Sequence, residues 1–198
     1  EHELNDTKKE ICNMFSRKIT SNPIAIRSQK WICNALIELM KQKPYNKISI
    51  TEICNKANLV RETFYRNFSS KDAVVKFCLE EKFNEFIDNI RIDKNNLTLY
   101  DMGVHYFGYW KEEKEFLKIL IDNKLLNIIL ENFSEQFSKI IDHLIKKEES
   151  MQTKSYIVDM YAGAFTNLLV KWILNDCKEP PEEMARIINE YGPINRCR

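Results

Sequence analysis

The sequence predicts an all-α protein with a small N-terminal domain and a larger helical bundle behind it. From Leu97 onward, no segment shows the alternation of apolar and polar residues that marks a strand. Gly and Pro are scarce, with 4 and 5 in the whole chain, which favours long helices joined by short turns. A capping-box spacing at Ser49 and Glu52 marks the start of a short helix within the N-terminal domain.

Residues 1–22 form a polar N-terminal extension of mixed charge. Its apolar residues have helical spacing, so the segment is expected to be either a short extra helix or a flexible arm. Pro23 separates it from a first helix predicted over Ile24 to Gln42. The buried side of that helix is expected to carry Trp31, Ala35, Leu36 and Leu39.

Two short helices joined by a tight turn are predicted between Ile48 and Lys71. The Ser49 hydroxyl can accept from the Glu52 N–H, while the Glu52 carboxylate reaches back to the Ser49 N–H. Asn58 follows the first short helix, at a point where the turn needs a residue that tolerates positive φ. The apolar face of this helix comprises Ile50, Ile53, Cys54 and Ala57.

The second short helix is predicted over Val60 to Phe68. Phe64 and Phe68 lie at i and i+4 and are expected to face inward. The outer face offers Arg, Asn, Thr and Tyr side chains, which suit base edges and phosphates. Such a pair indicates a helix-turn-helix, in which the second helix enters the major groove of DNA. The alternative is a helical hairpin packed in a larger bundle, with no role in DNA binding.

This segment resembles the DNA-binding domain of the TetR family of bacterial transcriptional regulators. The resemblance rests on a Thr-Phe-Tyr-x-x-Phe run followed by Ser-Lys-Asp-x-Val, and it extends upstream over Arg27 to Lys43 as the first helix. Two positions depart from the family pattern: Asn58 stands where Gly is usual, and Val60 where Ser or Thr is usual. The matching positions are Ile53, Ala57, Thr63, Phe64, Tyr65, Phe68, Ser70, Lys71, Asp72 and Val74.

The resemblance implies a DNA-binding domain over residues 23–70 and a regulatory and dimerisation domain over residues 71–198. Phosphate contacts are expected from Lys47, Thr51, Tyr65 and Lys71, and base contacts from Arg61, Glu62, Thr63 and Arg66. Val60 and Asn67 complete the predicted DNA-binding surface. Because Val60 has no side-chain oxygen to cap the second helix, which costs about 1 kcal/mol, its exact start stays open.

Charge is distributed unevenly, although the formal net charge is only +1. Between Arg17 and Lys71 there are 11 Lys and Arg against three Glu, whereas from Ala73 onward 17 Lys and Arg face 21 Asp and Glu. A basic front and an acidic back fit one domain that meets phosphate and one that does not. Chance clustering is the alternative explanation.

Six helices are predicted for the second domain. The first is capped by Ser69 or Ser70 and runs to about Ile90. The resemblance implies that it transmits a ligand signal to the second short helix, which enters the major groove. The others are expected over Leu99 to Trp110, Glu113 to Leu120, Leu125 to Lys147, Thr153 to Asp176 and Pro181 to Tyr191.

Aromatic side chains are dense on the helix that begins at Leu99. Amphipathic rings on neighbouring turns favour an apolar effector pocket with a few polar tips, although an aromatic core explains the same residues. The expected pocket residues are Met102, His105, Tyr106, Tyr109, Trp110, Phe116 and Tyr161.

The last two helices are expected to form a dimer interface. Apolar residues cover so much of the segment around Gly163 and Ala164 that one buried stripe does not account for them. The resemblance implies the same, because the family dimerises through its last two helices. The expected interface residues are Phe165, Leu168, Leu169, Trp172, Met184, Ile187 and Ile188.

Motifs for other classes of protein are missing from the sequence. The three histidines are not part of a Glu-x-x-His pair, and no P-loop, Gly-rich nucleotide fingerprint or nucleophile motif occurs, so no enzyme, metal or cofactor is expected. The six cysteines lack metal-site spacing, and Cys33, Cys54 and Cys78 are expected to be small core residues without a secreted disulfide framework. No signal peptide and no membrane-spanning run is predicted, so the cytoplasm is expected.

Together these patterns predict a cytoplasmic homodimer that binds a palindromic double-stranded DNA operator. The resemblance implies a ligand-responsive repressor with a small-molecule effector, because repression is the commoner behaviour in that family. Two alternatives stay open: a transcriptional activator controlled by a protein partner, and a helical protein-interaction module without DNA binding.

Overall fold

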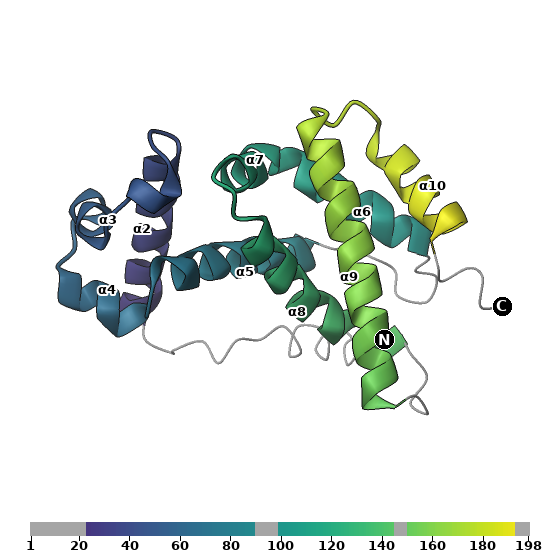
Figure 1. Ribbon diagram of the computed structural model, residues 1–198, viewed down its shortest axis with the longest axis horizontal. Helices are drawn as coiled ribbons and strands as arrows, with labels where there is room; N and C mark the ends of the chain where they lie inside the picture. Colours follow the sequence, from purple (N-terminus) through teal and green to yellow (C-terminus); the bar gives the residue numbers. More distant parts are fainter. Residues whose placement is uncertain (1–22, 90–98, 145–149, 193–198) are drawn as a thin grey trace.

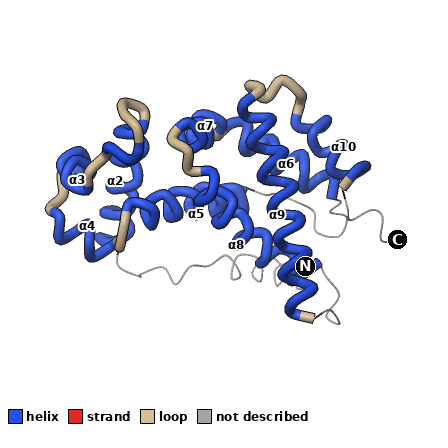
Figure 2. Tube along the Cα trace, in the orientation of Figure 1, coloured by secondary structure: helices blue, strands red, loops and turns tan. Residues whose placement is uncertain are grey.

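The computed structural model describes residues 23–89, 99–144 and 150–192 of the chain. Helices and turns account for these residues, and no strand occurs among them (Figure 2). The all-α prediction is therefore confirmed for the described part. The predicted N-terminal extension, residues 1–22, lies outside it.

The helix-turn-helix domain comprises α2 (Pro23–Met40), the 3₁₀ helix η1 (Tyr45–Lys47), α3 (Ile50–Ala57) and α4 (Arg61–Asn67). The first helix ends two residues before the expected Gln42, and α4 is one residue shorter at each end than predicted. The longer α5 (Lys71–Asn89) leads from this domain into the bundle.

The bundle comprises α6 (Leu99–Glu112), α7 (Lys114–Asp122), α8 (Leu126–Leu144), α9 (Met151–Leu174) and α10 (Pro181–Tyr191). All of these helices were predicted, and their boundaries differ by two residues at most, apart from the predicted end of α8 at Lys147, which lies outside the described residues.

The molecule is elongated, with α2, α3 and α4 at one end and the bundle at the other (Figure 1). α5 lies between them and contacts α2 near its start and α8 further along (Figure 1). Within the bundle, α10 packs along α6 and α8 packs along α9. The position of the helix-turn-helix relative to the bundle therefore depends on α5.

One hydrophobic core runs through both domains. It includes Ile32 and Leu36 of α2, Phe64 of α4 and Trp110 of α6, each 0% exposed. Aromatic contacts continue it, because the Phe68 ring lies 5.4 Å from that of Phe77 on α5. The burial of these rings helps to hold the end of α4 against α5.

α9 corrects the expectation that no apolar run is long enough to span a bilayer. By length and composition alone, this 24-residue helix could cross a membrane. In the fold it packs against α8 and α7, and 44% of its most apolar window is buried. A helix in the core of a bundle passes the same test, so α9 is weak evidence for a membrane.

The described cysteines take two forms. Cys54 and Cys177 are buried free thiols, as expected for small core residues. Cys33 and Cys78 instead form a disulfide that joins α2 to α5, with their Cα atoms 5.9 Å apart. Their expected core positions are confirmed, because Cys78 is 2% exposed and Cys33 packs against the core, but the bond between them was not predicted.

Candidate functional site

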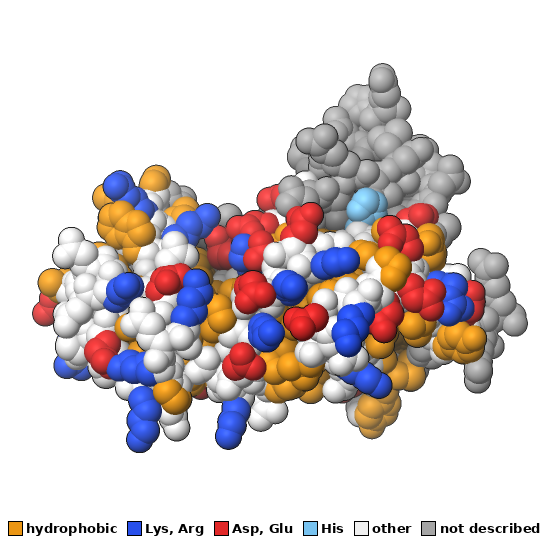
Figure 3. All heavy atoms as spheres, turned by 90° about the horizontal axis from the view of Figure 1, so that it is seen from above, with side chains coloured by type: hydrophobic (Ala, Val, Ile, Leu, Met, Phe, Trp, Pro, Cys, Tyr) orange, Lys and Arg blue, Asp and Glu red, His pale blue; other side chains and the backbone are white. Residues whose placement is uncertain are grey.

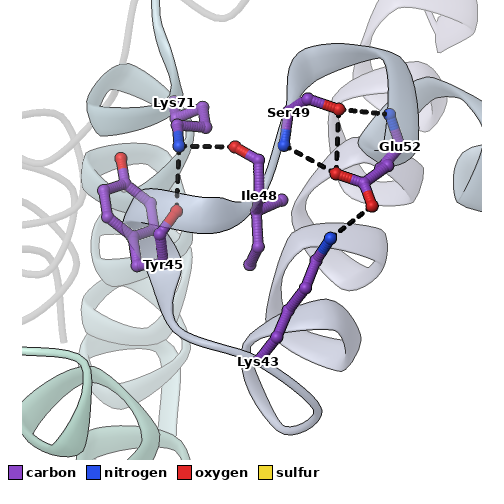
Figure 4. A network of polar contacts seen from close by, with 6 residues as sticks. All are labelled: Lys43, Tyr45, Ile48, Ser49, Glu52 and Lys71. Atoms are coloured by element: carbon purple, nitrogen blue, oxygen red, sulfur yellow. Dashed lines mark hydrogen bonds and ion pairs between the residues drawn. The ribbon is translucent and has the colours of Figure 1, made fainter.

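The start of α3 is held by the capping box that the sequence predicts. The Glu52 N–H donates to Ser49 Oγ at 3.2 Å, and the Ser49 N–H donates to Glu52 Oε2 at 2.9 Å (Figure 4). Lys43 adds an ion pair to the other carboxylate oxygen of Glu52. Hydrogen bonds from Lys43 and from the Ser49 N–H together lower the pKa of Glu52 to about 2.

The turn between α3 and α4 depends on Asn58. Its φ of 55° and ψ of 46° place it in the left-handed region, as the sequence predicts. The Leu59 N–H then donates to the Cys54 carbonyl at 2.9 Å, which closes the end of α3. Val60 follows as the N-cap of α4 with no side-chain hydrogen bond, so the helix begins without a polar cap.

α4 is fixed by its inner face. Phe64 is fully buried and Phe68 is 6% exposed, with their ring centroids 6.0 Å apart. This confirms the predicted inward pair and leaves the opposite side of α4 at the surface.

That outer side carries the residues predicted to contact DNA. Arg61, Glu62, Tyr65 and Arg66 are exposed, whereas Thr63 and Asn67 are half-buried. The Arg61 guanidinium lies over the Tyr65 ring, 5.9 Å from its centroid, and donates to the Tyr65 hydroxyl at 3.3 Å. Lys47, Thr51 and Val60 are also exposed.

Lys71 is placed differently from a free surface lysine. Its ammonium donates to the Tyr45 carbonyl at 2.9 Å and to the Ile48 carbonyl at 2.6 Å (Figure 4). It also lies 4.5 Å from the centroid of the Tyr45 ring, and burial lowers the pKa of Lys71. Lys71 thus ties the start of α5 to the segment that leads into α3.

Asn123, at the end of α7, connects the bundle to this same segment. Its Oδ1 accepts from the Tyr45 N–H at 2.7 Å, and its Nδ2 donates to the Met40 carbonyl at 3.3 Å and to the Ile119 carbonyl at 2.9 Å. Sequence reasoning missed Asn123, because nothing local distinguishes it from other helix-end asparagines.

The predicted effector residues separate into two groups. His105 and Tyr109 line an open groove of about 390 Å³ between α5, α6 and the start of α10. Tyr106 and Trp110 instead point into the core, at 6% and 0% exposure. Met102 and Phe116 are half-buried, and Tyr161 is buried.

The bundle core contains buried polar atoms without hydrogen-bond partners. Within the described part of the chain, these atoms are Tyr106 Oη and Trp110 Nε1 on α6, both polar side-chain atoms of Asn132 on α8, and Thr166 Oγ1 on α9. Aromatic rings connect the same helices. The ring centroids of Tyr106 and Phe165 lie 6.0 Å apart, and those of Trp110 and Phe133 lie 5.2 Å apart.

The predicted dimer residues are largely covered within one protomer. Leu169, Trp172, Met184 and Ile188 are buried, and Trp172 Nε1 donates to the Glu179 carbonyl at 3.1 Å. Phe165, Leu168 and Ile187 are half-buried. On the outer side of α9, a stripe of exposed residues follows helical spacing; we call it the α9 stripe, and it comprises Met160, Ala164, Asn167, Lys171 and Leu174.

No single sign of charge covers the face of the molecule seen in Figure 3, where Lys and Arg are interspersed with Asp and Glu. Three or more His, Cys, Asp or Glu residues do not cluster in metal-binding geometry anywhere in the described ranges.

Two family profiles match the chain. Residues 32–77 match "Bacterial regulatory proteins, tetR family", which covers most of the helix-turn-helix and the start of α5. Residues 98–191 match "Transcriptional regulator C-terminal region", which covers α6 to α10.

Curated relatives point the same way. The chain is 26% identical over 133 residues to the HTH-type dhaKLM operon transcriptional activator DhaS of Lactococcus lactis, a match that covers 63% of this chain and 64% of that protein. It is 27% identical over 156 residues to the transposon Tn10 TetC protein of Escherichia coli, covering 73% and 75% of the two chains. A solved structure of the dihydroxyacetone kinase operon activator DhaS superposes with a TM-score of 0.51 at 22% identity, covering 85% of this chain and 95% of that one.

Proposed function

This chain belongs to the TetR family of DNA-binding transcriptional regulators, and we propose that it binds a palindromic operator as a homodimer. The family consists of regulators and not of enzymes. The geometry of α4 carries the proposal: its inner side is fixed by Phe64 and Phe68, which leaves Arg61, Tyr65 and Arg66 exposed along a helix of the size that enters a major groove.

We propose that bases are contacted by Arg61, Glu62, Thr63 and Arg66. Arginine is the best candidate for a bidentate contact to guanine. Lys47, Thr51 and Tyr65 are proposed to contact phosphates, with Val60 and Asn67 at the margins. The Lys71 ammonium donates two hydrogen bonds to backbone carbonyls, so at most its remaining N–H group is available to a phosphate.

The test is selection of bound duplexes from a random pool at two salt concentrations. A protein that binds DNA as a dimer should enrich a palindrome whose half-sites lie about 34 Å, or a multiple of that, apart. Its affinity should fall as salt rises, because bound cations release counterions from DNA. A folded protein that enriches no sequence and shows no salt-dependent affinity would favour the interaction-module alternative.

Arg61→Ala then separates base contact from phosphate contact. If Arg61 contacts a base, the variant should lose about 1–3 kcal/mol at one base pair of the site and tolerate substitution there. Equal loss on all sequences would restrict Arg61 to a phosphate. Lys56→Ala, on an exposed residue of α3 outside the proposed surface, is the matched control.

For the dimer, we propose the α9 stripe together with the half-buried Phe165, Leu168 and Ile187 as the interface. A Cβ added at Gly163 would meet no other group within 4 Å, so a second helix can approach there closely. Ala164→Glu should dissociate the dimer in sedimentation experiments, whereas Asp159→Ala should not. A dimer that survives Ala164→Glu would contradict this interface.

For regulation, we propose a small-molecule effector that binds in the bundle near Tyr106, and repression as the output. The unpartnered polar atoms of Tyr106, Trp110, Asn132 and Thr166 support it, because buried polar groups normally have partners. An effector shifts the balance between two conformations when it binds one of them more tightly. Here it would favour a dimer whose two α4 helices do not match the spacing of the operator half-sites, and DNA would be released.

The alternative output is activation under a protein partner. One comparison favours activation as the output, since the relative DhaS is named as a transcriptional activator. A reporter gene placed behind the selected operator separates the two outputs: deletion of the regulator should raise expression for a repressor and lower it for an activator. The cytoplasm is the proposed location, because operator DNA lies there.

A further inference from the structure

We propose that Cys33 and Cys78 form a reversible thiol–disulfide switch that controls operator binding. The inference rests on the proposed DNA-binding function, and it adds a redox input to the proposed effector input. The pair differs from the other described cysteines, because Cys54 and Cys177 are buried free thiols whose pKa values burial raises.

The position of the pair gives it leverage. Cys33 lies in the middle of α2, the helix on which both α3 and α4 pack. Cys78 lies on α5, which packs against α8 in the bundle. The bond therefore crosses the joint about which the helix-turn-helix would move relative to the bundle.

The other contacts across this joint are noncovalent, and they include the hydrogen bonds from Lys71 to the Tyr45 and Ile48 carbonyls. α2 and α5 pack against each other, and packed helices can slide slightly past one another. A salt bridge between Lys30 and Glu81, 3.2 Å long, joins an exposed lysine to a half-buried glutamate, and a pair of this kind contributes little to stability. A disulfide does not adjust in this way, since it keeps the two Cα atoms within about 4.4–6.8 Å.

The compartment supports a reversible bond. Thiols are kept reduced where DNA is transcribed in bacteria, and disulfides found there are usually transient, catalytic or redox-sensing. A structural role would need the bond to be permanently closed. A switch needs only that the thiols lie within bonding reach, which the Cα separation of 5.9 Å provides.

The proposed oxidant is a low-molecular-weight disulfide such as oxidised glutathione. The half-buried Cys33 thiolate attacks one of its sulfurs and releases one small thiol. The Cys78 thiolate then attacks the Cys33 sulfur of the mixed disulfide and releases the second small thiol. Two protein thiols are oxidised and one small disulfide is reduced, and the two protein thiol protons end on the released thiols.

The expected sign follows from the motion that the bond prevents. A dimer must adjust two helix-turn-helix domains to one half-site spacing, and the bond removes that adjustment on both sides. Oxidation should therefore weaken operator binding by about five-fold or more, at the low end of typical coupling between sites.

The experiment uses the full chain with Cys12→Ser and Cys197→Ser, so that only the four described cysteines remain. The protein is equilibrated in buffers of reduced and oxidised glutathione, and its thiols are counted by alkylation and mass. Affinity for the selected palindrome is then measured by fluorescence anisotropy. Two thiols should disappear together, and affinity should fall in the same buffers.

Single-cysteine variants test whether the Cys33–Cys78 bond causes the loss of operator affinity on oxidation. Cys33→Ser and Cys78→Ala should each abolish the response and keep the affinity of the reduced protein, while Cys54→Ala should leave the response intact. A pair that stays reduced in every buffer, or an oxidised form that binds equally well or more tightly, would overturn the proposal.

Failure of the proposed function would look different. If selection recovers no operator, amide hydrogen exchange of α3 and α4 replaces the affinity measurement. Oxidation should then slow exchange in both helices, and identical exchange in the two forms would overturn the switch.

Discussion

The contact between the two domains and the interior of the bundle use asparagine in opposite ways. Asn123 joins the domains and makes three hydrogen bonds, to Tyr45, Met40 and Ile119. Asn132, in the bundle core, is fully buried, and neither of its side-chain polar atoms has a partner. Among the described residues, every buried side-chain polar atom without a partner lies in the bundle.

The difference separates a part whose polar groups satisfy one another from a part that holds buried polar atoms without hydrogen-bond partners. Around Tyr45 and Ser49, polar groups satisfy one another and fix the entry to α3 (Figure 4). In the bundle, unpartnered atoms lower the stability of the protein, and a polar ligand would satisfy them.

The largest effect is expected from Phe64→Ala in α4. Phe64 is fully buried, and truncation of a buried Phe costs about 3–5 kcal/mol of unfolding free energy. The loss should appear in denaturant unfolding and should abolish DNA binding. Tyr65→Ala, on the exposed side of the same helix, is the control and should change stability little; similar losses for both variants would mean that α4 is not anchored by its inner face.

The two asparagines should respond to leucine with opposite signs. Asn123→Leu removes three hydrogen bonds and should destabilise the protein by about 1–3 kcal/mol. Asn132→Leu removes polar atoms that have no partner and should stabilise the protein by a similar amount, about 1–3 kcal/mol. Thermal unfolding of both variants measures these changes. If both substitutions destabilise the protein, the two asparagines do not have opposite effects on its stability.

A smaller gain is expected from Val60→Ser at the start of α4. Val60 is 62% exposed and caps the helix without a side-chain hydrogen bond. A serine hydroxyl in that place should add about 1 kcal/mol of stability. Val60→Ala is the control, because it changes the size of the side chain without supplying an acceptor; a gain for alanine as large as that for serine would rule out capping as the cause.

The smallest effect concerns pH. Because Lys43 and the Ser49 N–H hold the pKa of Glu52 at about 2, below the ordinary value of 4.5, its ionised form is favoured by folding. That contribution is present above pH 4.5 and is lost as the pH falls from 4.5 towards 2. Glu52→Gln should flatten this part of the stability profile, whereas Glu62→Gln should not. An unchanged profile for Glu52→Gln would show that the capping box contributes nothing through its charge.

Local features of the fold were predictable from the sequence. The Ser49–Glu52 capping box, the left-handed Asn58 and the inward pair Phe64 and Phe68 each involve residues at most four positions apart. Spacing within a helix determines such contacts, so one segment of sequence contains the information.

Contacts between distant segments were not predictable in this way. Asn123 lies 78 residues from Tyr45, and Cys33 lies 45 residues from Cys78. Only the packing of α2 on α5 and of α7 near η1 brings them together. The aromatic helix α6 shows the same limit, since periodicity placed Tyr106 and Tyr109 on one amphipathic segment without showing which ring enters the core. The residues predicted for DNA, effector and dimer contacts stay predictions until binding is measured.

The hydrogen bonds of Asn123 also set a rule for building chimeric regulators. A designer who moves residues 23–89 of this chain onto another bundle leaves behind Asn123, whose side chain binds the Tyr45 N–H and the Met40 carbonyl. The graft would carry the DNA specificity but lose its connection to the host sensor at that point. The transferable module is therefore residues 23–89 together with an asparagine at the matching α7 end of the recipient.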